Sequence, residues 1–241
     1  MDRLALLPGV EITREGGVWM REERAYVVAD LHLGYEAAAR REGAFMPPMQ
    51  LKAVLAALDA IIRTYAPRTI VVNGDLKHSF DRNLRQEWEE VSMVLDHLMR
   101  DVETVEVLRG NHDNYLAAIL AKRGMELKPH TVIGGLKIAH GHKRVERDGW
   151  LLQGHEHPCL KVRDALGAEL SLPCFLWSRA ERIIVLPAIS PIVFGRNVLS
   201  PGATPLSPAI KHFKEFETAG LSSEGLMRFG RVRDLRGTHV S

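Results

Sequence analysis

Histidine, aspartate and asparagine gather at five separate points of the sequence, and each point follows a short apolar run. The five stretches are "VADLH" (28–32), "NGD" (73–75), "RGNHD" (109–113), "AHGH" (139–142) and "QGHEH" (153–157). Imidazole, carboxylate and amide groups without a thiolate suit divalent ions of intermediate hardness, such as manganese, iron or zinc. Each residue alone also fits a structural role, as a helix cap, a turn residue or a surface side chain. Their recurrence at five such points favours one shared site.

The number of candidate metal ligands exceeds the need of a single ion. The candidates are Asp30, His32, Asp75, Asn111, His140, His155 and His157. A catalytic zinc takes about three protein ligands, so this set predicts two ions. We expect manganese, with iron or zinc as the alternatives, and Asp75, alone after its apolar run, is the natural bridging ligand. Two ions about 3.5–4 Å apart are the arrangement that clamps the attacking and leaving oxygens in phosphoryl displacement.

Alternating strands and helices must position these residues. Apolar, β-branched runs predict strands at 25–30, 69–75, 104–113, 136–142 and 150–157. Amphipathic patterns predict helices over about 47–64, 83–100 and 114–123. This alternation favours parallel strands, whose carboxyl ends form the edge of a sheet where ligands bind. Residues two apart on an extended strand point the same way, so we expect His155 and His157 to face one site.

The remaining segments predict a second, more antiparallel sheet and a C-terminal extension. Strands after about residue 135 follow one another closely, and "VEITREGGVWM" predicts a hairpin that turns at Gly16 and Gly17. Proline, glycine and serine become frequent after about residue 198. We therefore expect one domain over residues 1–198 and an extension over 199–241 with one short helix and a loose end.

Composition narrows the class of protein. The chain has 241 residues, 46% of them hydrophobic, and a formal net charge of +2, so no strong global field recruits a polyanion or a membrane. Cys159 and Cys174 cannot form a disulfide framework, and the apolar runs are too short and too broken by proline to span a membrane. No signal peptide is recognisable at the start of the chain. We expect a cytoplasmic protein without a membrane partner.

The five stretches resemble, in order and spacing, the signature of the calcineurin-like metallophosphoesterases. The matching residues are "DLH" (30–32), "GD" (74–75), "GNHD" (110–113), "HG" (140–141) and "GHEH" (154–157). Beyond them, "VADLHLGYE", "GDLKHSF" and "VLPAISP" resemble the SbcD-related branch, which includes a ligase-associated DNA repair endonuclease. The resemblance covers about residues 25–190. It implies an α/β fold, a four-layer αββα sandwich of two mixed β-sheets flanked by helices.

The resemblance also implies a role for each matching residue. Asp30, His32 and His157 would bind the first metal ion. Asn111, His140 and His155 would bind the second, and Asp75 would bridge the two. His112 would donate a proton to the leaving oxygen or contact the transferred phosphate. Asp113 would orient the His112 ring without itself binding a metal ion. A hydroxide that bridges the metals would be the nucleophile.

Three further residues are candidates for contact with the substrate. Many relatives carry a second acid where this chain has His78, three residues after the bridging aspartate. Lys77 and His78 therefore either contact a phosphate or belong to a solvated loop. His142 lies two residues after His140. We expect it either to contact the metal ligands without binding an ion or to face the substrate.

The leading functional hypothesis is a nuclease, a metal-dependent phosphodiesterase that acts on single-stranded or flexible DNA. The chain is too short for the added DNA-capping domain of the superfamily's break-repair nucleases, so its site is expected to be open. DNA repair proteins are the expected partners, and the sequence predicts no oligomeric state. The alternative is a phosphoesterase for nucleotides, cyclic nucleotides or generic phosphodiesters, which the lack of a large basic surface favours. A third hypothesis, a degenerate metal-binding module, conflicts with the complete set of ligands.

Overall fold

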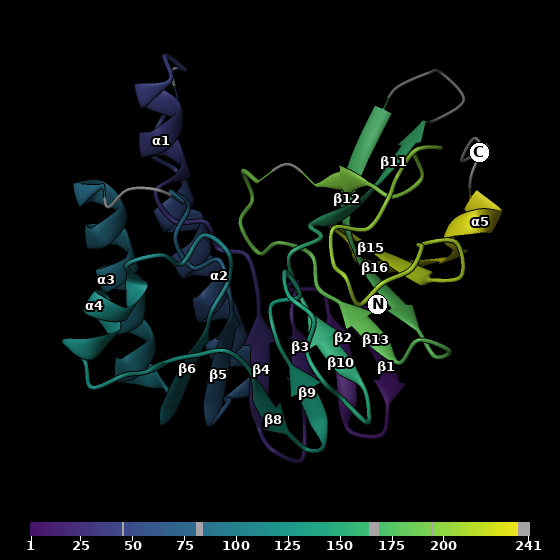
Figure 1. Ribbon diagram of the computed structural model, residues 1–241, viewed down its shortest axis with the longest axis horizontal. Coiled ribbons are helices and arrows are strands. Elements are labelled where there is room, and N and C mark those ends of the chain that lie inside the picture. The colour runs from purple at the N-terminus through teal and green to yellow at the C-terminus, as the bar shows by residue number, and fades with distance from the viewer. Residues whose placement is uncertain (45, 81–83, 164–168, 194, 236–241) are drawn as a thin grey trace.

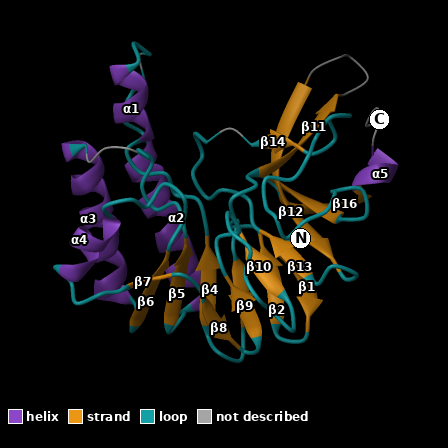
Figure 2. Cartoon of the chain, in the orientation of Figure 1, coloured by secondary structure: helices purple, strands orange, loops and turns teal. Residues whose placement is uncertain are grey.

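Two β-sheets packed face to face form the centre of the molecule in the computed structural model, which describes residues 1–241 except 45, 81–83, 164–168, 194 and 236–241 (Figure 1). Helices α1 to α4 lie together on one side of this pair of sheets (Figure 2). The core between the sheets contains Val27 and Val71 from the first sheet and Ile138, Leu152 and Ile184 from the second. All five side chains are buried, and their packing fixes the position of one sheet relative to the other.

The first sheet has seven strands in sequence order. They are β1 (Arg3–Leu7), β2 (Val10–Thr13), β3 (Val18–Met20), β4 (Ala25–Val28), β5 (Thr69–Asn73), β6 (Thr104–Leu108) and β7 (Leu127–Lys128). Strands β1 to β4 are antiparallel and β4 to β7 are parallel, so the carboxyl ends of β4, β5 and β6 meet at one edge. The hairpin of β2 and β3 turns at Gly16 and Gly17 as predicted.

Four helices accompany this sheet. They are α1 (Tyr35–Arg41), α2 (Gln50–Tyr65), α3 (Arg85–Asp101) and α4 (Leu116–Ala121). Helix α2 places Val54, Leu58, Ile61 and Tyr65 on one buried stripe, because these positions recur at helical spacing. The predicted helices are present with shifted ends, whereas α1 was not predicted. It has only seven residues and starts after Gly34, whose φ of 87° gives the chain a sharp turn there.

The second sheet is mixed and includes the C-terminal strands. Its strands are β8 (Thr131–Ile133), β9 (Leu136–Ile138), β10 (Leu151–Gln153), β11 (Pro158–Arg163), β12 (Glu169–Ser178), β13 (Ile183–Val185), β14 (Arg196–Asn197), β15 (Glu217–Ser222) and β16 (Gly225–Arg231). Strands β9, β10 and β13 are parallel, and the main order is β14-β11-β12-β13-β10-β9-β8. Strand β15 pairs with both β12 and β16. Two mixed sheets with flanking helices confirm the predicted fold class.

The expected C-terminal extension adds β15 and β16 to the second sheet, and the segment before them packs on the outer face of that sheet. Ile210, Phe213 and Phe216 are buried there against Leu176 and Val185. This fourth layer is built mainly of turns, and its helix, α5 (Val232–Leu235), has only four residues and follows the β15–β16 hairpin. This helix lies within the end that the sequence predicted to be loose. The two strands were not predicted either, because "ETAG" and "GLMRFG" carry weak strand patterns on their own.

Two features of the chain concern its environment: the length of its helices and the state of its two cysteines. None of the described helices is long and apolar enough to cross a membrane. Cys159 and Cys174 are both buried free thiols, and burial raises the pKa of each. A raised pKa leaves the thiol protonated and unreactive at neutral pH.

Candidate active site

The candidate ligands lie in the loops directly after the strands, not on the strands themselves. Strand β4 ends at Val28, β5 at Asn73 and β10 at Gln153. Five of the candidates have a positive φ: Asp30 (60°), His32 (48°), Asp75 (49°), His155 (69°) and His157 (42°). Such a conformation costs a non-glycine residue about 1–3 kcal/mol and persists where the surroundings enforce it. The prediction that His155 and His157 share extended backbone is therefore wrong, and the turn at each residue aims its ring separately.

One cluster of ligand atoms forms where the loops after β4, β5 and β10 meet. It contains Asp30, His32, Asp75 and His157, whose ligand atoms all lie within 4.8 Å of one another. Nε2 of His157 lies 3.1 Å from Oδ1 of Asp30 and 3.2 Å from Nε2 of His32. Nε2 of His32 lies 3.7 Å from Oδ2 of Asp75. All four side chains therefore converge on one point.

A second cluster shares Asp75 with the first. It contains Asp75, His140 and His155, again with ligand atoms within 4.8 Å of one another. Nε2 of His140 lies 3.2 Å from Oδ2 of Asp75 and 3.2 Å from Oδ1 of Asn111. The other ring nitrogen of His140, Nδ1, donates to the backbone carbonyl of Asn73 at 3.0 Å. That bond leaves Nε2 free to bind an ion.

The distances within these clusters fit a metal ion. Two ligand atoms bound to one ion at about 2.0–2.2 Å lie roughly 3.0–3.5 Å apart for angles near 90–110°. The contacts between His157 and Asp30 and between His140 and Asp75 are in this range. Oδ1 of Asp30 is completely buried and accepts no hydrogen bond from the described residues. A buried carboxylate oxygen without a donor is destabilising unless a cation compensates it.

The protonation states also suit metal binding. Burial lowers the pKa of His32 to about 3 and that of His155 to about 4. Both rings are therefore neutral at pH 7, which is the form that binds a metal ion. Burial also acts to lower the pKa of His140, but the hydrogen bond and charge of Asp75 outweigh it and raise that pKa to about 9. An ion that binds His140 near neutral pH has to displace a proton.

Two glycines let backbone and ligand carboxylates approach closely. A Cβ at Gly110 would lie 2.0 Å from Oδ1 of Asp75, and a Cβ at Gly154 would lie 2.5 Å from Oδ2 of Asp30. Neither distance is compatible with a side chain. The glycines of the "GNHD" and "GHEH" motifs thus serve the two carboxylates by leaving room for them.

Asp113 supports the site through the backbone. Its side chain is fully buried and accepts N–H groups from Asp75 (2.9 Å), Leu76 (3.0 Å), Lys77 (3.3 Å) and Gly110 (2.8 Å). The sequence predicted that Asp113 orients His112. The structure corrects this expectation, because the carboxylate fixes the loop that carries the bridging Asp75, and all four of these bonds go to backbone groups.

His112 lies at the open side of the first cluster. Its backbone N–H donates to Oδ1 of Asp75 at 2.8 Å, and its Nδ1 bonds the backbone carbonyl of His78. The rings of His112 and His32 are 5.0 Å apart, and the His78 ring stacks on His112 at 5.6 Å. With Nδ1 held by a carbonyl, a protonated His112 can present Nε2–H toward the site. The ligand atoms of His32, His78 and His112 also lie within 4.8 Å of one another.

The structure corrects the prediction for Lys77, whereas His78 stays at the site. Lys77 is fully buried, and its Nζ lies 3.4 Å from Oε2 of Glu87 and donates to the carbonyl of Ser79. Its buried ammonium therefore neither contacts a phosphate nor lies in solvent. Burial and the charge of His112 lower the pKa of His78 to about 4, so this ring is neutral at pH 7.

His142 lies beside the second cluster and lines a pocket next to it. Its ring is 5.3 Å from that of His140 and 6.2 Å from that of His155. Burial, followed by the charges of His140, Lys143 and Arg109, lowers its pKa to about 4. His142 is therefore neutral at pH 7 and stands next to two positive side chains.

Several supporting residues were not predicted from the sequence. Glu87 on α3 accepts the backbone N–H groups of His78 (3.0 Å) and Ser79 (2.6 Å) and thereby fixes the loop against His112. Gln50 on α2 donates to the backbone carbonyls of Leu31 (3.0 Å) and His32 (2.9 Å). Both residues lie far from the motifs in sequence. A polar residue on the apolar face of a helix was the available signal.

Glu156 lies between two ligands in sequence, but its side chain faces away from them. Its Oε1 accepts the backbone N–H groups of Leu206 (2.9 Å) and Ser207 (2.7 Å), and Oε2 lies 3.3 Å from Nη1 of Arg196. These contacts tie the C-terminal extension to the loop of the metal ligands.

Five loops with convergent aspartate and histidine, above two packed mixed sheets, define a metallophosphoesterase fold and site. A sequence profile described as calcineurin-like phosphoesterase matches residues 23–155, and the chain belongs to this family. It is a metal-dependent phosphoesterase. The fold is similar to that of a Pseudomonas putida nuclease, MPE, with a TM-score of 0.70 and 19% identity over 95% of this chain and 99% of that one.

A second solved structure is less similar to this chain. The phosphoesterase YfcE of E. coli gives a TM-score of 0.39 and 14% identity over 87% of this chain and 93% of that one. A comparison with curated protein sequences gave no significant match.

Proposed function

We propose that the protein is a phosphodiesterase with two metal ions and that it cleaves single-stranded or flexible DNA. The observation that carries the proposal is the position of Asp75, whose carboxylate belongs to both ligand clusters. A shared carboxylate between two sets of ligands is the arrangement that holds two ions at one phosphate.

The residues divide into two sets by position. Asp30, His32 and His157 would hold one ion, and Asn111, His140 and His155 the other. Bound there, two divalent ions supply Lewis-acid stabilisation of a phosphate and activate water for attack. Manganese is the ion we propose, because neutral imidazoles together with carboxylate and amide oxygens suit it, and iron and zinc are the alternatives.

His112 is proposed as the proton donor to the leaving oxygen. Its Nδ1–H donates to the backbone carbonyl of His78, so a protonated ring keeps Nε2–H available on the side of the site. Stacking of His78 on His112 keeps both rings at the edge where a phosphate would enter. We propose that His78 contacts the substrate there.

The preference for DNA rests on the similarity of the fold. The protein of similar fold from P. putida is named a nuclease. The small-molecule alternative remains the competing hypothesis, and we expect a function in the cytoplasm with DNA repair proteins as partners. Diester cleavage without DNA cleavage would decide for the alternative.

The test uses protein stripped of metal with EDTA and then supplied with manganese, magnesium, iron or zinc. Bis-p-nitrophenyl phosphate reports diester cleavage, p-nitrophenyl phosphate reports monoester cleavage, and circular single-stranded DNA reports endonucleolytic cleavage. We expect manganese to support hydrolysis of the diester and nicking of the circle. Diester hydrolysis with intact circles would contradict the nuclease function. Absence of turnover with every metal would favour a binding module.

The variant His112→Ala separates proton donation from metal binding. We expect DNA cleavage to fall by about 10²- to 10⁴-fold, the usual contribution of a general acid. Metal content measured by mass spectrometry should stay at the wild-type value, because the ring is proposed to donate a proton and not to bind the ion. Asp75→Asn is the matched control and should lose metal together with activity. Equal metal loss in both variants would contradict the role of His112.

A further inference from the structure

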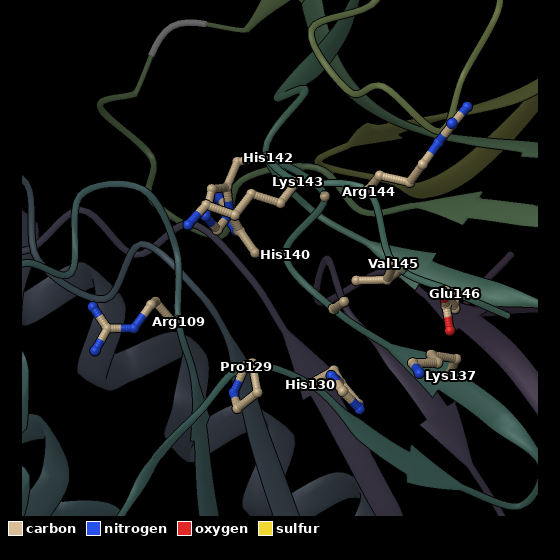
Figure 3. Close-up of a pocket in the computed structure, with 12 residues that line it drawn as sticks. Arg109, Pro129, His130, Lys137, His140, His142, Lys143, Arg144, Val145 and Glu146 are labelled. Carbon is tan, nitrogen blue, oxygen red and sulfur yellow. The ribbon is translucent and has the colours of Figure 1, made fainter.

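A pocket of about 400 Å³ opens directly beside the second ligand cluster. Its lining includes His140, a proposed metal ligand, so the pocket and the reacting phosphate share one wall. Its volume is in the range of about 300–1,000 Å³ that is typical of small-molecule sites. Figure 3 shows the lining residues, which come from the loops after β6, β7 and β9 and from β9 itself.

The pocket combines apolar and cationic surfaces. Pro129, Ala139 and Val145 contribute apolar groups. Figure 3 shows Lys143 beside His142 and His140, with Arg109 and Lys137 on either side of them. The guanidinium of Arg144 points away from His140 in the same view.

The cations of this pocket are not used by the fold. Within the described part of the chain, no carboxylate lies at ion-pair distance from Arg109, Lys137 or Lys143. Glu146 is the single acidic residue of the lining. By contrast, Arg147, which follows in sequence, donates to the backbone carbonyls of Gly149 (2.8 Å), Glu181 (2.8 Å) and Arg182 (3.0 Å) and is structural.

We propose that this pocket binds the nucleotide next to the scissile phosphodiester. The base and sugar would lie against the apolar groups, and the neighbouring phosphate would lie between Arg109 and Lys143. The inference rests on the proposed nuclease function and names the part of the strand that the site recognises. A substrate with a single phosphate, such as bis-p-nitrophenyl phosphate, has no second phosphate to place between Arg109 and Lys143.

The test compares two double variants that each remove one arginine and one lysine. Arg109→Gln with Lys143→Gln removes the cations of the pocket. Arg63→Gln with Lys214→Gln is the control, because both residues are exposed, Arg63 lies in the last turn of α2, and Lys214 precedes β15. The change in net charge is identical, so a general loss of attraction for DNA affects both pairs equally.

We expect the pocket variant to cleave a single-stranded oligonucleotide with kcat/KM reduced about three- to thirtyfold relative to the control. The plot of log kcat/KM against log salt concentration should lose about 0.7 of its slope, since the variant removes one single-stranded phosphate contact. Equal kcat/KM and equal slope in the two double variants would overturn the proposal. Parallel loss of bis-p-nitrophenyl phosphate hydrolysis and DNA cleavage would also overturn it, because the cations would then act on the metal centre.

A competition experiment tests the occupant directly. Thymidine 3′,5′-bisphosphate offers a nucleoside and two phosphates, and we expect it to inhibit at a concentration at least about tenfold below that of inorganic phosphate. The pocket variant should be inhibited by the two compounds at similar concentrations. A tenfold difference that persists in the pocket variant would overturn the proposal. Failure of the nuclease function is a separate result: the wild-type protein would hydrolyse the small diester but leave the oligonucleotide intact.

Discussion

Replacement of Asp113 by asparagine tests how the metal centre is built. The carboxylate is fully buried and accepts four backbone N–H groups, two at each oxygen. Asparagine has nearly the same shape but keeps one acceptor oxygen. Its NH₂ group would therefore face two backbone donors, either those of Asp75 and Gly110 or those of Leu76 and Lys77.

The expected loss of stability follows from these bonds. Each hydrogen bond to a charged acceptor contributes about 1.5–3 kcal/mol, so two lost bonds cost about 3–6 kcal/mol. Removal of the buried charge offsets part of this cost, because burial and the charge of Asp75 raise the pKa of Asp113 to about 6. We expect Asp113→Asn to lower the free energy of unfolding by about 2–4 kcal/mol. For a chain of this length that corresponds to a fall in Tm of about 4–16 °C.

The assay is urea unfolding of the metal-free protein, followed by titration with manganese. Asp148→Asn is the control, because Asp148 is exposed and should leave stability unchanged. We also expect manganese affinity to fall about 10- to 100-fold in Asp113→Asn, since the loop of Asp75 is no longer held. A variant with wild-type stability and manganese affinity that lacks only turnover would refute this reasoning. In that case Asp113 would act on the His112 ring, as the family resemblance implied.

Three further results are expected. Gly154→Ala should bind less metal than the wild type in mass spectrometry, because its Cβ would lie 2.5 Å from Oδ2 of Asp30; full metal occupancy would contradict the close approach. Manganese at about 100 times its Kd should add about 2.7 kcal/mol per ion to the free energy of unfolding. This gain should raise Tm by about 5–10 °C in calorimetry. Asp75→Asn should remove most of this shift, and an unchanged shift would exclude Asp75 as a shared ligand. Burial lowers the pKa of His32 to about 3, so between pH 6.5 and 3 the unfolded chain binds a proton that the folded chain does not. The metal-free protein should therefore lose stability from pH 7 to pH 5, and equal urea midpoints at the two pH values would contradict the buried neutral ring.

The sequence predicted the architecture of the parallel half of the molecule well. Strands β4, β5 and β6 and helices α2 and α3 carry strong periodic patterns, because each buries one face or both. Helix α1 and the β15–β16 hairpin were not predicted, since their residues form weak patterns and their structure depends on contacts with α3 and β12. Tertiary contacts override weak local preference in such segments.

The types of residue at the site were decided by the sequence alone. Aspartate, asparagine and histidine in five stretches, without a thiolate, predicted a site for divalent metal ions, because donor chemistry is a property of the side chain. The parallel order of β4, β5 and β6 then predicted that three of these stretches meet at one edge. The other two follow β9 and β10, and only the packing of the second sheet on the first brings them to the same site.

The tertiary structure decided which atoms face one another. It turned His155 and His157 toward different clusters through positive φ at each residue and turned Asp113 toward four backbone donors and not toward the His112 ring. It also buried Lys77 against Glu87, 10 residues away, and left Arg109 and Lys143 at one pocket. The direction of a side chain depends on the backbone dihedral angles of its loop and on neighbours distant in sequence. Residue order and spacing do not contain that information.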